Sequence, residues 1–323
     1  MKTMIRIAVL CMGVSAFFQS CSDWTDVENK MIQNLEGEPK SEVYYENLRA
    51  YKKTDHQLAF GWFGFWSGGT STSARGSLRS TPDSMDIVSI WGEKYNLTQA
   101  HIDDLRYVQE KYGTRVTFTL FSHNMSNLFK GGECPFPNEP EYIPQAAKAL
   151  SDSIFKYGYD GIDFDHECSA GDLFYNKDNM TTLLREMRKN LGPDKLILVD
   201  GHIGYITEEG WQYANYAVSQ AYNTGGPSSL ESRYNSVKKY IGPERLIVTE
   251  NFEANWETGG VNYTDEDGNK MPSLLGMARW QPKDGGRKGG CGAYHMEYEY
   301  KHDPEYKYMR QAIQIMNPAN PNN

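Results

Sequence analysis

The sequence lacks the features that would assign it to several common classes of protein. It has no surplus of positive charge, because 33 Lys and Arg residues stand against 42 Asp and Glu residues in 323, giving a formal net charge of −9. Proteins that bind nucleic acids need basic patches that neutralise phosphates, so we expect no nucleic-acid partner. After residue 20, no apolar run reaches the roughly 20 residues that a membrane-spanning helix needs.

Motifs for metal binding are also missing. The five cysteines include no Cys-x-x-Cys pair, and the seven histidines show no ligand spacing. We therefore expect neither a structural zinc ion nor any other metal or cofactor. Aromatic residues make up 13% of the chain, which favours a folded protein over a disordered one.

The first 20 residues have the form of an export signal. Lys2 and Arg6 precede an apolar run from Ile7 to Phe18 that is too short to span a bilayer. The small residue directly before Cys21 makes this segment resemble a bacterial lipoprotein signal, in which Cys21 is acylated. We expect a lipid-anchored protein of the bacterial outer membrane. Cleavage as an ordinary signal peptide is the alternative.

Polar residues follow this signal. Asp23, Asp26 and Glu28 resemble the acidic export signals of surface lipoproteins in the Bacteroides group, so we expect exposure at the cell surface. Residues 21–54 are interpreted as a tether and an N-terminal cap that includes a helix at Glu42–Tyr51. Residues 319–323 are expected to be a flexible tail.

From residue 57 onward, short strand-like runs alternate with longer amphipathic segments. The strand candidates are Gln57–Phe63, Asp86–Trp91, Arg115–Phe121, Gly161–Asp165, Lys195–Gly201, Tyr216–Tyr222, Arg245–Asn251 and Gly292–Met296. The helical patterns between them include Ile143–Tyr157, Thr181–Leu191 and Leu230–Tyr240. This alternation predicts an α/β fold with one domain, a (β/α)8 TIM barrel over residues 55–318. Segment 253–270 is expected to be a long acidic loop.

The segment from Asp160 to Glu167 carries several acids at regular spacing. Because alternate side chains of a strand face opposite ways, Asp163, Asp165 and Glu167 share one face. Carboxyl groups this close raise the pKa of at least one member, which suits a general acid. The carboxyl end of a barrel strand is also the usual place for catalysis. Catalysis is therefore favoured over a calcium site or a solvated acidic edge.

The spacing Asp160-x-x-Asp163-x-Asp165-x-Glu167 matches the D-x-x-D-x-D-x-E signature, so the chain resembles glycoside hydrolase family 18. The resemblance implies retaining catalysis in which the 2-acetamido group of the substrate is the nucleophile. It implies that Glu167 protonates the leaving oxygen and later deprotonates water, while Asp165 orients the acetamide. Asp163 would hold Asp165 through a shared proton, and Asp160 would support them from behind.

Gln220-Ala221-Tyr222-Asn223 is a second element that resembles the family. The resemblance implies that the Tyr222 hydroxyl donates to the acetamide carbonyl, with Gln220 and Asn223 beside the substrate. Packing of Tyr222 in the core is the alternative.

Aromatic residues at or just after the ends of the first two predicted strands are candidate platforms for sugar rings. They are Trp62, Phe65, Trp66 and Trp91. The alternative is that these side chains fill the core of the barrel and its helical layer.

Departures from the chitinase pattern narrow the resemblance. Chitinases typically have Met-x-Tyr-Asp where this chain has Gln220 and Asn223, and a Trp on the last strand, where residues 292–298 contain none. The chain is therefore more similar to the endo-β-N-acetylglucosaminidases of the family, which cut the chitobiose core of N-linked glycans. A chitinase and a non-catalytic glycan-binding lipoprotein are the alternatives. We expect a GlcNAc-containing glycan or glycoprotein as the substrate, and a monomer.

Overall fold

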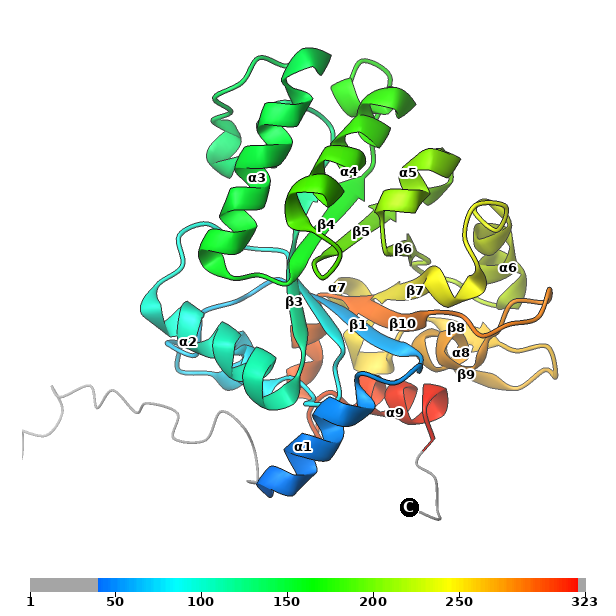
Figure 1. The fold of residues 1–323 in the computed structure, drawn as a ribbon. Coiled ribbons are helices and arrows are strands. Elements are labelled where there is room, and N and C mark those ends of the chain that lie inside the picture. Colours follow the sequence, from blue (N-terminus) through cyan, green and yellow to red (C-terminus); the bar gives the residue numbers. More distant parts are fainter. Residues whose placement is uncertain (1–39, 319–323) are drawn as a thin grey trace, which may run out of the picture.

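A ring of parallel strands surrounded by helices forms the centre of the molecule in the computed structural model (Figure 1). The structure describes residues 40–318; the predicted signal peptide, Cys21, the tether up to residue 39 and the tail 319–323 lie outside the described residues. Within residues 40–318, eight strands pair in the order β1-β10-β7-β6-β5-β4-β3-β2, and β1 pairs with β2 to close the ring. The prediction of a (β/α)8 TIM barrel is confirmed.

The barrel strands agree with the predicted runs to within two residues at each end. They are β1 (Leu58–Phe63), β2 (Ile87–Ile90), β3 (Arg115–Phe121), β4 (Gly161–His166), β5 (Leu196–Gly201), β6 (Tyr216–Gln220), β7 (Leu246–Asn251) and β10 (Gly290–Tyr294). The last strand ends two residues before the predicted Met296, because His295 adopts a left-handed backbone conformation with φ 53°. That conformation cannot continue an extended strand.

The helices surround the barrel. They are α1 (Glu42–Tyr51), α2 (Gln99–Tyr107), α3 (Ile143–Tyr157), α4 (Lys177–Leu191), α5 (Glu208–Tyr213), α6 (Pro227–Asn235), α7 (Phe252–Asn255), α8 (Ser273–Arg279) and α9 (Lys307–Met316). Helices α1 and α3 have the predicted bounds. Helix α4 begins four residues before its predicted start because the Asn176 side chain accepts N–H groups of the first turn. Helix α6 ends before the predicted Tyr240, and the following residues form turns.

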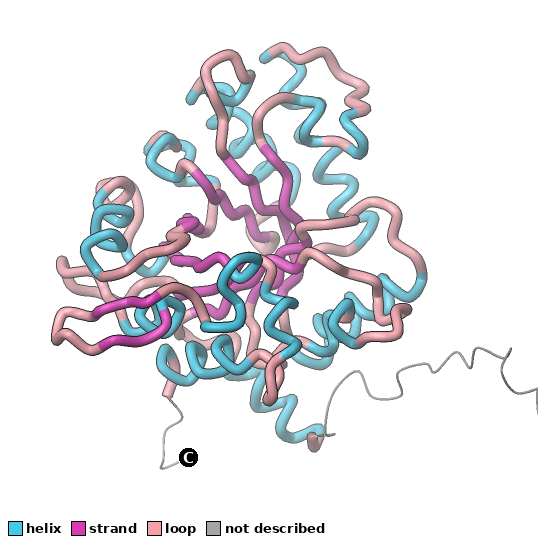
Figure 2. The backbone as a smooth tube through the Cα atoms, turned by 180° about the vertical axis from the view of Figure 1, so that it is seen from behind, coloured by secondary structure: helices cyan, strands magenta, loops and turns pink. Residues whose placement is uncertain are grey.

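The segment 253–270 is not the long loop that its acidic sequence predicts. Strands β8 (Asn262–Thr264) and β9 (Lys270–Pro272) form an antiparallel hairpin that begins in this segment and ends just after it, apart from the barrel strands in Figure 2. The Asp265 carboxylate accepts the backbone N–H groups of Asp267 at 3.0 Å and Asn269 at 2.8 Å, and so closes the turn. The acidic side chain therefore builds the hairpin instead of preventing it.

The side chains of the strands form two separate apolar layers. Those that fill the barrel interior are Phe60, Trp62, Ile87, Leu196, Leu198, Val218 and Ile247. The alternate side chains face the helices in a larger cluster, to which Ile162 and Phe164 of β4 belong. Since neighbouring residues of a strand face opposite ways, the acids between these two point into the barrel. The predicted division of faces on β4 is confirmed.

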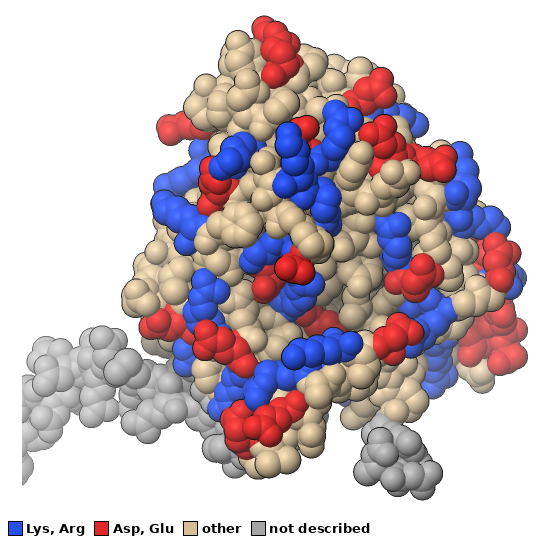
Figure 3. Space-filling model, viewed as in Figure 1, with Lys and Arg blue, Asp and Glu red and all other residues tan. Residues whose placement is uncertain are grey.

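The surface visible in Figure 3 carries Lys and Arg side chains interspersed with Asp and Glu side chains, so neither sign dominates this face. In the part of the chain that the structure describes, no helix is both long enough and apolar enough to cross a membrane.

Candidate active site

The acids of β4 lie at successive depths, from the interior of the barrel to its mouth. Asp163 is fully buried and Asp165 is 3% exposed, whereas Glu167 lies one residue beyond the strand and is exposed. The three side chains therefore pass from a dry interior to solvent within five residues. Such a gradient lets one strand present both a buried acid and an accessible one.

Asp163 is held by donors from two other strands, Trp62 of β1 across the barrel interior and Thr119 of the neighbouring β3. The indole N–H of Trp62 donates to its Oδ2 atom at 2.7 Å, and the Thr119 hydroxyl donates to the same atom at 3.0 Å. The Thr119 hydroxyl also pairs with the Ser89 hydroxyl at 2.8 Å. Burial raises the pKa of Asp163 to about 6, although these donors favour the ionised form.

Asp165 lies between the fully buried Asp163 and the exposed Glu167 along the chain. Burial raises its pKa to about 7, and the charges of Glu167 and Asp163 act in the same direction. The side-chain amide of Gln220 donates to its Oδ1 atom at 3.3 Å and opposes the rise. Asp165 therefore gains or loses its proton near neutral pH, where small changes in its surroundings decide its charge.

Gly201 leaves the space that the Glu167 side chain occupies. Its φ of 78° disfavours other residues, and an added Cβ would lie 3.0 Å from the Glu167 Cγ atom and 2.9 Å from the His166 carbonyl oxygen. The last residue of β5 is thus shaped to let Glu167 lie at the barrel mouth.

Tyr222 lies two residues beyond β6 and is half-buried. Burial, with the nearby Asp200 and Asp165, raises the pKa of its phenol, so the group stays a neutral hydroxyl that can donate a hydrogen bond. The next residue, Asn223, has a left-handed φ of 57°, and its N–H donates to the Glu250 Oε1 atom at 2.9 Å. The buried Glu250 carboxylate therefore fixes the turn that carries Tyr222.

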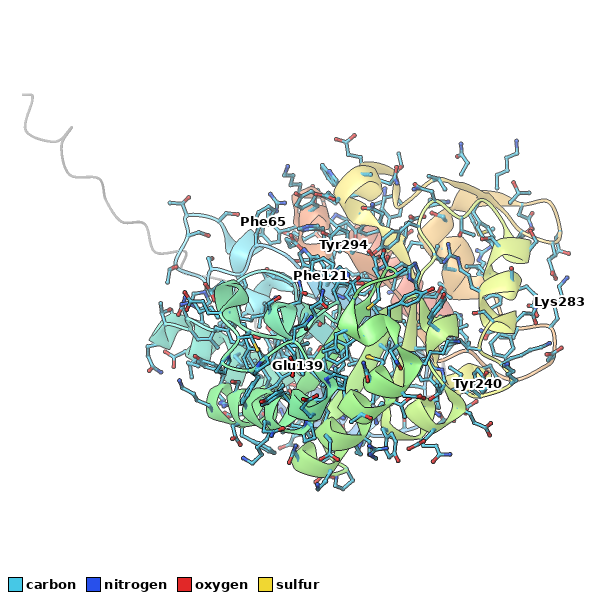
Figure 4. All side chains as sticks on the ribbon, turned by 90° about the horizontal axis from the view of Figure 1, so that it is seen from above. Phe65, Phe121, Glu139, Tyr240, Lys283 and Tyr294 are labelled. Carbon is cyan, nitrogen blue, oxygen red and sulfur yellow. The ribbon has the colours of Figure 1, made fainter. Side chains whose placement is uncertain are left out.

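Aromatic rings border the mouth of the barrel. Tyr294 at the end of β10 lies 6.1 Å from Tyr222, 5.5 Å from Trp91 and 6.2 Å from Trp62, measured between ring centroids. Figure 4 shows Phe65, Tyr294 and Phe121 gathered in one region of the molecule. Phe65 is 52% exposed and Phe121 is 38% exposed, which leaves apolar faces available for a ligand.

A cavity of about 650 Å³ opens beside this mouth, between the segments that follow β2 and β3. Trp91, Tyr95, Phe121 and Phe129 contribute apolar walls, and Lys94 contributes its stem and ammonium group. Its size and mixed lining are those of a site for a small organic ligand.

Three predicted site residues do not have their predicted roles: Trp62 belongs to the site as a partner of Asp163 and not as a sugar platform, and Trp66 and Asp160 lie elsewhere. Trp62 is buried inside the barrel, where it binds Asp163 instead of offering a face to a sugar. Trp66 is buried in the outer layer and donates to the Asp104 Oδ2 atom at 2.9 Å. Asp160 precedes β4 at the opposite end of the barrel, about 16 Å along the strand from Asp165.

Asp160 serves the packing of the strands instead. Its Oδ2 atom accepts the Val116 N–H at 2.8 Å and the Gln109 amide at 2.6 Å. The indoles of Trp62 and Trp66 are consumed by buried hydrogen bonds, and Asp160 lies too far along the strand to support the other acids.

Of the other predicted substrate contacts, Trp91 lies at the rim and Phe65 is exposed above it, while Gln220 points into the barrel. Asn223 is exposed next to Tyr222. Their contact with a substrate stays a prediction.

The sequence analysis overlooked Asp200, Glu250 and Tyr294. Asp200 and Glu250 are each the last residue but one of a largely apolar strand, and an acid after a run of at least three apolar residues was a signal that could have found both. Asp200 pairs in register with Asp165, is 1% exposed and accepts the Gln220 amide at 2.7 Å. Burial, with the charges of Asp163 and Asp165, raises its pKa well above the ordinary value.

Among residues 40–318, no three His, Cys, Asp or Glu side chains are arranged to hold a metal ion. Buried aspartates beside an accessible glutamate, in an aromatic-bordered barrel mouth, are the kind of site that a glycoside hydrolase uses. Residues 25–315 match the description "Glycoside hydrolase family 18, BT1044-like". The chain belongs to glycoside hydrolase family 18.

Known proteins agree with this assignment. The chain is 27% identical over 348 residues to endo-beta-N-acetylglucosaminidase F2 of Elizabethkingia meningoseptica, covering 98% of this chain and 100% of that protein. It is also 27% identical over 309 residues to endo-beta-N-acetylglucosaminidase EndoS of Streptococcus pyogenes serotype M1, covering 78% of this chain and 31% of EndoS. A solved structure of BT1044 superimposes with a TM-score of 0.78 at 28% identity, covering 86% of this chain and 93% of that one.

Two indole-to-carboxylate hydrogen bonds provide a matched pair of variants. We expect Trp62→Phe to lower the kcat of glycoside hydrolysis by about 10-fold, because Asp163 next to the reacting groups loses a donor. Trp66→Phe removes the equivalent donor from Asp104 in the outer layer, and should leave kcat near the wild-type value. Equal losses in the two variants, measured at matched folded fractions, would contradict the assignment of Trp62 to the site.

The buried acids should make the folded state less stable as the pH rises. The folded pKa of Asp165, about 7, lies above its ordinary value of 3.8, so its contribution is present below about pH 4 and is lost between about pH 4 and 7. That difference corresponds to at most about 4 kcal/mol. Thermal unfolding should therefore show Asp165→Asn gaining stability relative to the wild type at pH 8 but not at about pH 4.

Asp172 is a control whose pKa is shifted in the opposite direction. Its backbone hydrogen bond from Ser169 lowers its pKa, so its contribution is present at neutral pH and is lost on acidification. Asp172→Asn should lose stability at pH 8. A common response of both variants to pH would show that the burial of Asp165 is not the cause.

Proposed function

We propose that this chain is an endo-β-N-acetylglucosaminidase that hydrolyses the GlcNAc-β-1,4-GlcNAc core of N-linked glycans with retention of configuration. The observation that carries the proposal is the convergence of Asp165, Glu167 and Tyr222 on one barrel mouth. The first is buried, the second is accessible and the third is a neutral donor. This set suits a substrate that brings its own nucleophile, the oxygen of its 2-acetamido group.

Each group has one role in the proposed reaction. Glu167 donates a proton to the glycosidic oxygen while the acetamide oxygen attacks the anomeric carbon and the glycosidic bond breaks. Asp165, ionised at this step, accepts the acetamide N–H and stabilises the positive charge of the ring that forms. Tyr222 donates its hydroxyl to the acetamide oxygen. Glu167 then takes a proton from water, which attacks the anomeric carbon and releases the acetamide group.

The endo-acting specificity is supported by the names of the two curated relatives, both endo-beta-N-acetylglucosaminidases. The last strand also ends in Tyr294 instead of Trp, and the aromatic-walled cavity beside the mouth offers room for a branched glycan. A chitinase is the alternative, and it differs in the substrate that it accepts rather than in the reaction.

We test the proposal with two kinds of substrate, a glycoprotein with N-linked glycans and soluble chitin oligomers. Mass spectrometry should show a loss of mass that leaves one GlcNAc on each glycosylated Asn, with little cleavage of the oligomers. Cleavage of chitin oligomers alone would make the protein a chitinase, and equal hydrolysis of glucosides would exclude a mechanism that needs the acetamide.

Glu167→Gln tests the catalytic assignment in the same assay. We expect hydrolysis to fall by at least 100-fold while the variant still binds the glycan, because the amide cannot deliver a proton. Glu110→Gln, in an exposed position before β3, is the matched control and should retain full activity. If the wild type is no faster than Glu167→Gln, the protein is a glycan-binding lipoprotein and not an enzyme.

The proposed location rests on the sequence of residues 1–28, which lie outside the described residues. We propose that Cys21 is acylated and anchors the enzyme to the outer membrane, with the barrel at the cell surface. Radiolabelled palmitate should enter the wild type and Cys134→Ala but not Cys21→Ala, and only Cys21→Ala should leave the membrane fraction. Label retained by Cys21→Ala would disprove the anchor.

A further inference from the structure

Asp200 is a buried acid that the proposed reaction does not use. It is the inward-facing residue near the end of β5, paired in register with Asp165 of β4 and 1% exposed. Three carboxyl groups, those of Asp163, Asp165 and Asp200, therefore share the interior just below the barrel mouth.

The hydrogen bonds around Asp200 satisfy one of its two oxygens and leave the other without a donor. Its Oδ1 atom accepts the Gln220 amide at 2.7 Å, and the same amide reaches Asp165 at 3.3 Å. Its Oδ2 atom is buried and has no donor, and the same holds for the Asp163 Oδ1 atom. The Asp163 and Asp200 side chains lie within hydrogen-bonding reach of each other, as do Asp165 and Asp200.

Two carboxylates that lie within hydrogen-bonding reach of each other, each with a buried oxygen that has no donor, would repel each other if both were ionised. A proton on one of them removes the repulsion and satisfies both atoms with a single hydrogen bond. Asp163 already accepts Trp62 and Thr119 at its other oxygen, which favours its ionised form. Asp200 has only the Gln220 amide, so the proton belongs on Asp200.

Among residues 40–318, no hydrogen bond or ion pair joins a Lys or Arg side chain to Asp163, Asp165 or Asp200. In the described part of the chain, the ionisable groups that act on these three acids are other acids: Asp163 and Asp165 on Asp200, and Glu167 on Asp165. Other ionisable neighbours of Asp165 are the phenols of Tyr222 and Tyr294 and the thiol of Cys168, and burial raises the pKa of each, which keeps it neutral. Burial raises the pKa of Asp200 well above its ordinary value, in agreement with a retained proton.

We infer that Asp200 is a positioning residue that stays protonated and donates its O–H to the Asp163–Asp165 pair, so that Asp165 can be ionised when it accepts the acetamide N–H. This inference rests on the proposed function, and it adds a third carboxyl group to the pair that the sequence motif supplies. No proton leaves the cluster during turnover: the O–H of Asp200 moves between acceptors on Asp163 and Asp165 as their charges change.

Two substitutions separate this role from a merely structural one. Asp200→Asn keeps a neutral donor of similar shape, so its kcat should stay within about 3-fold of the wild type and the acid limb of its pH profile should not move. Asp200→Ala removes the donor, so the pKa of Asp165 should rise. We expect its acid limb to move to higher pH and its kcat to fall by about 10- to 100-fold, with KM little changed.

The contrary results are equally distinct. If Asp200 were ionised in the resting enzyme, Asp200→Asn would remove a negative charge beside Asp165 and shift the acid limb to lower pH, which would overturn the inference. An Asp200→Ala variant that keeps the wild-type pH profile would also overturn it. Asp104→Asn, at a buried acid of the outer layer, controls for loss of stability and should leave the profile unchanged.

An infrared measurement keeps this test independent of the proposed substrate. The C=O stretch of a protonated, buried carboxylic acid should persist in the wild-type protein at pH 8 and disappear in Asp200→Asn. Its absence from the wild type would overturn the inference whether or not the protein cleaves N-glycans. If the band is present but glycoproteins are not cleaved, the proposed function fails and the protonation of Asp200 stands.

Discussion

The burial of several carboxyl groups inside the barrel is the constraint on which the site depends, and in the described part of the chain the side chains that bond them are neutral donors. Water solvates a carboxylate far better than a protein interior does, so each buried acid either keeps a proton or needs several donors. Trp62, Thr119 and Gln220 supply those donors from three different strands. The barrel thereby holds acids that change charge near neutral pH, at the place where a reaction needs them.

Burying these carboxyl groups lowers the stability of the folded protein and in return provides acids that can take part in a reaction. The interior around Phe60 and Leu198 is apolar and closely filled, and the acids interrupt it only near the carboxyl ends of the strands. Glu167 lies beyond that region in solvent, in space that Gly201 leaves open. Strain and unpaired charge are concentrated at the mouth, while the rest of the barrel supplies a rigid frame around it.

Local patterns predicted most of the architecture. Alternation along residues 161–166 is enough to place Asp163 and Asp165 on the inward face of β4, because the period of a strand is two residues wherever the strand lies. The order of apolar runs likewise located the other barrel strands to within two residues. Local pattern failed at segment 253–270, where Asp265 closes a hairpin through contacts with its own backbone, and composition alone indicated a loop.

The sequence by itself determined the barrel, the acidic motif and the family, because these depend on spacing along one strand and on the order of strands and helices. Tertiary structure alone decided the partners of each polar group: Trp62 with Asp163, Trp66 with Asp104, Asp160 with Val116 and Asp200 with Asp163 and Asp165. The sequence does not distinguish a Trp or Asp in the site from one elsewhere, since an indole or a carboxyl group has the same chemistry in any position. The roles of these residues depend on which strands pack beside one another in the folded barrel. The spacing of residues along one strand does not predict contacts between segments that are far apart in the sequence.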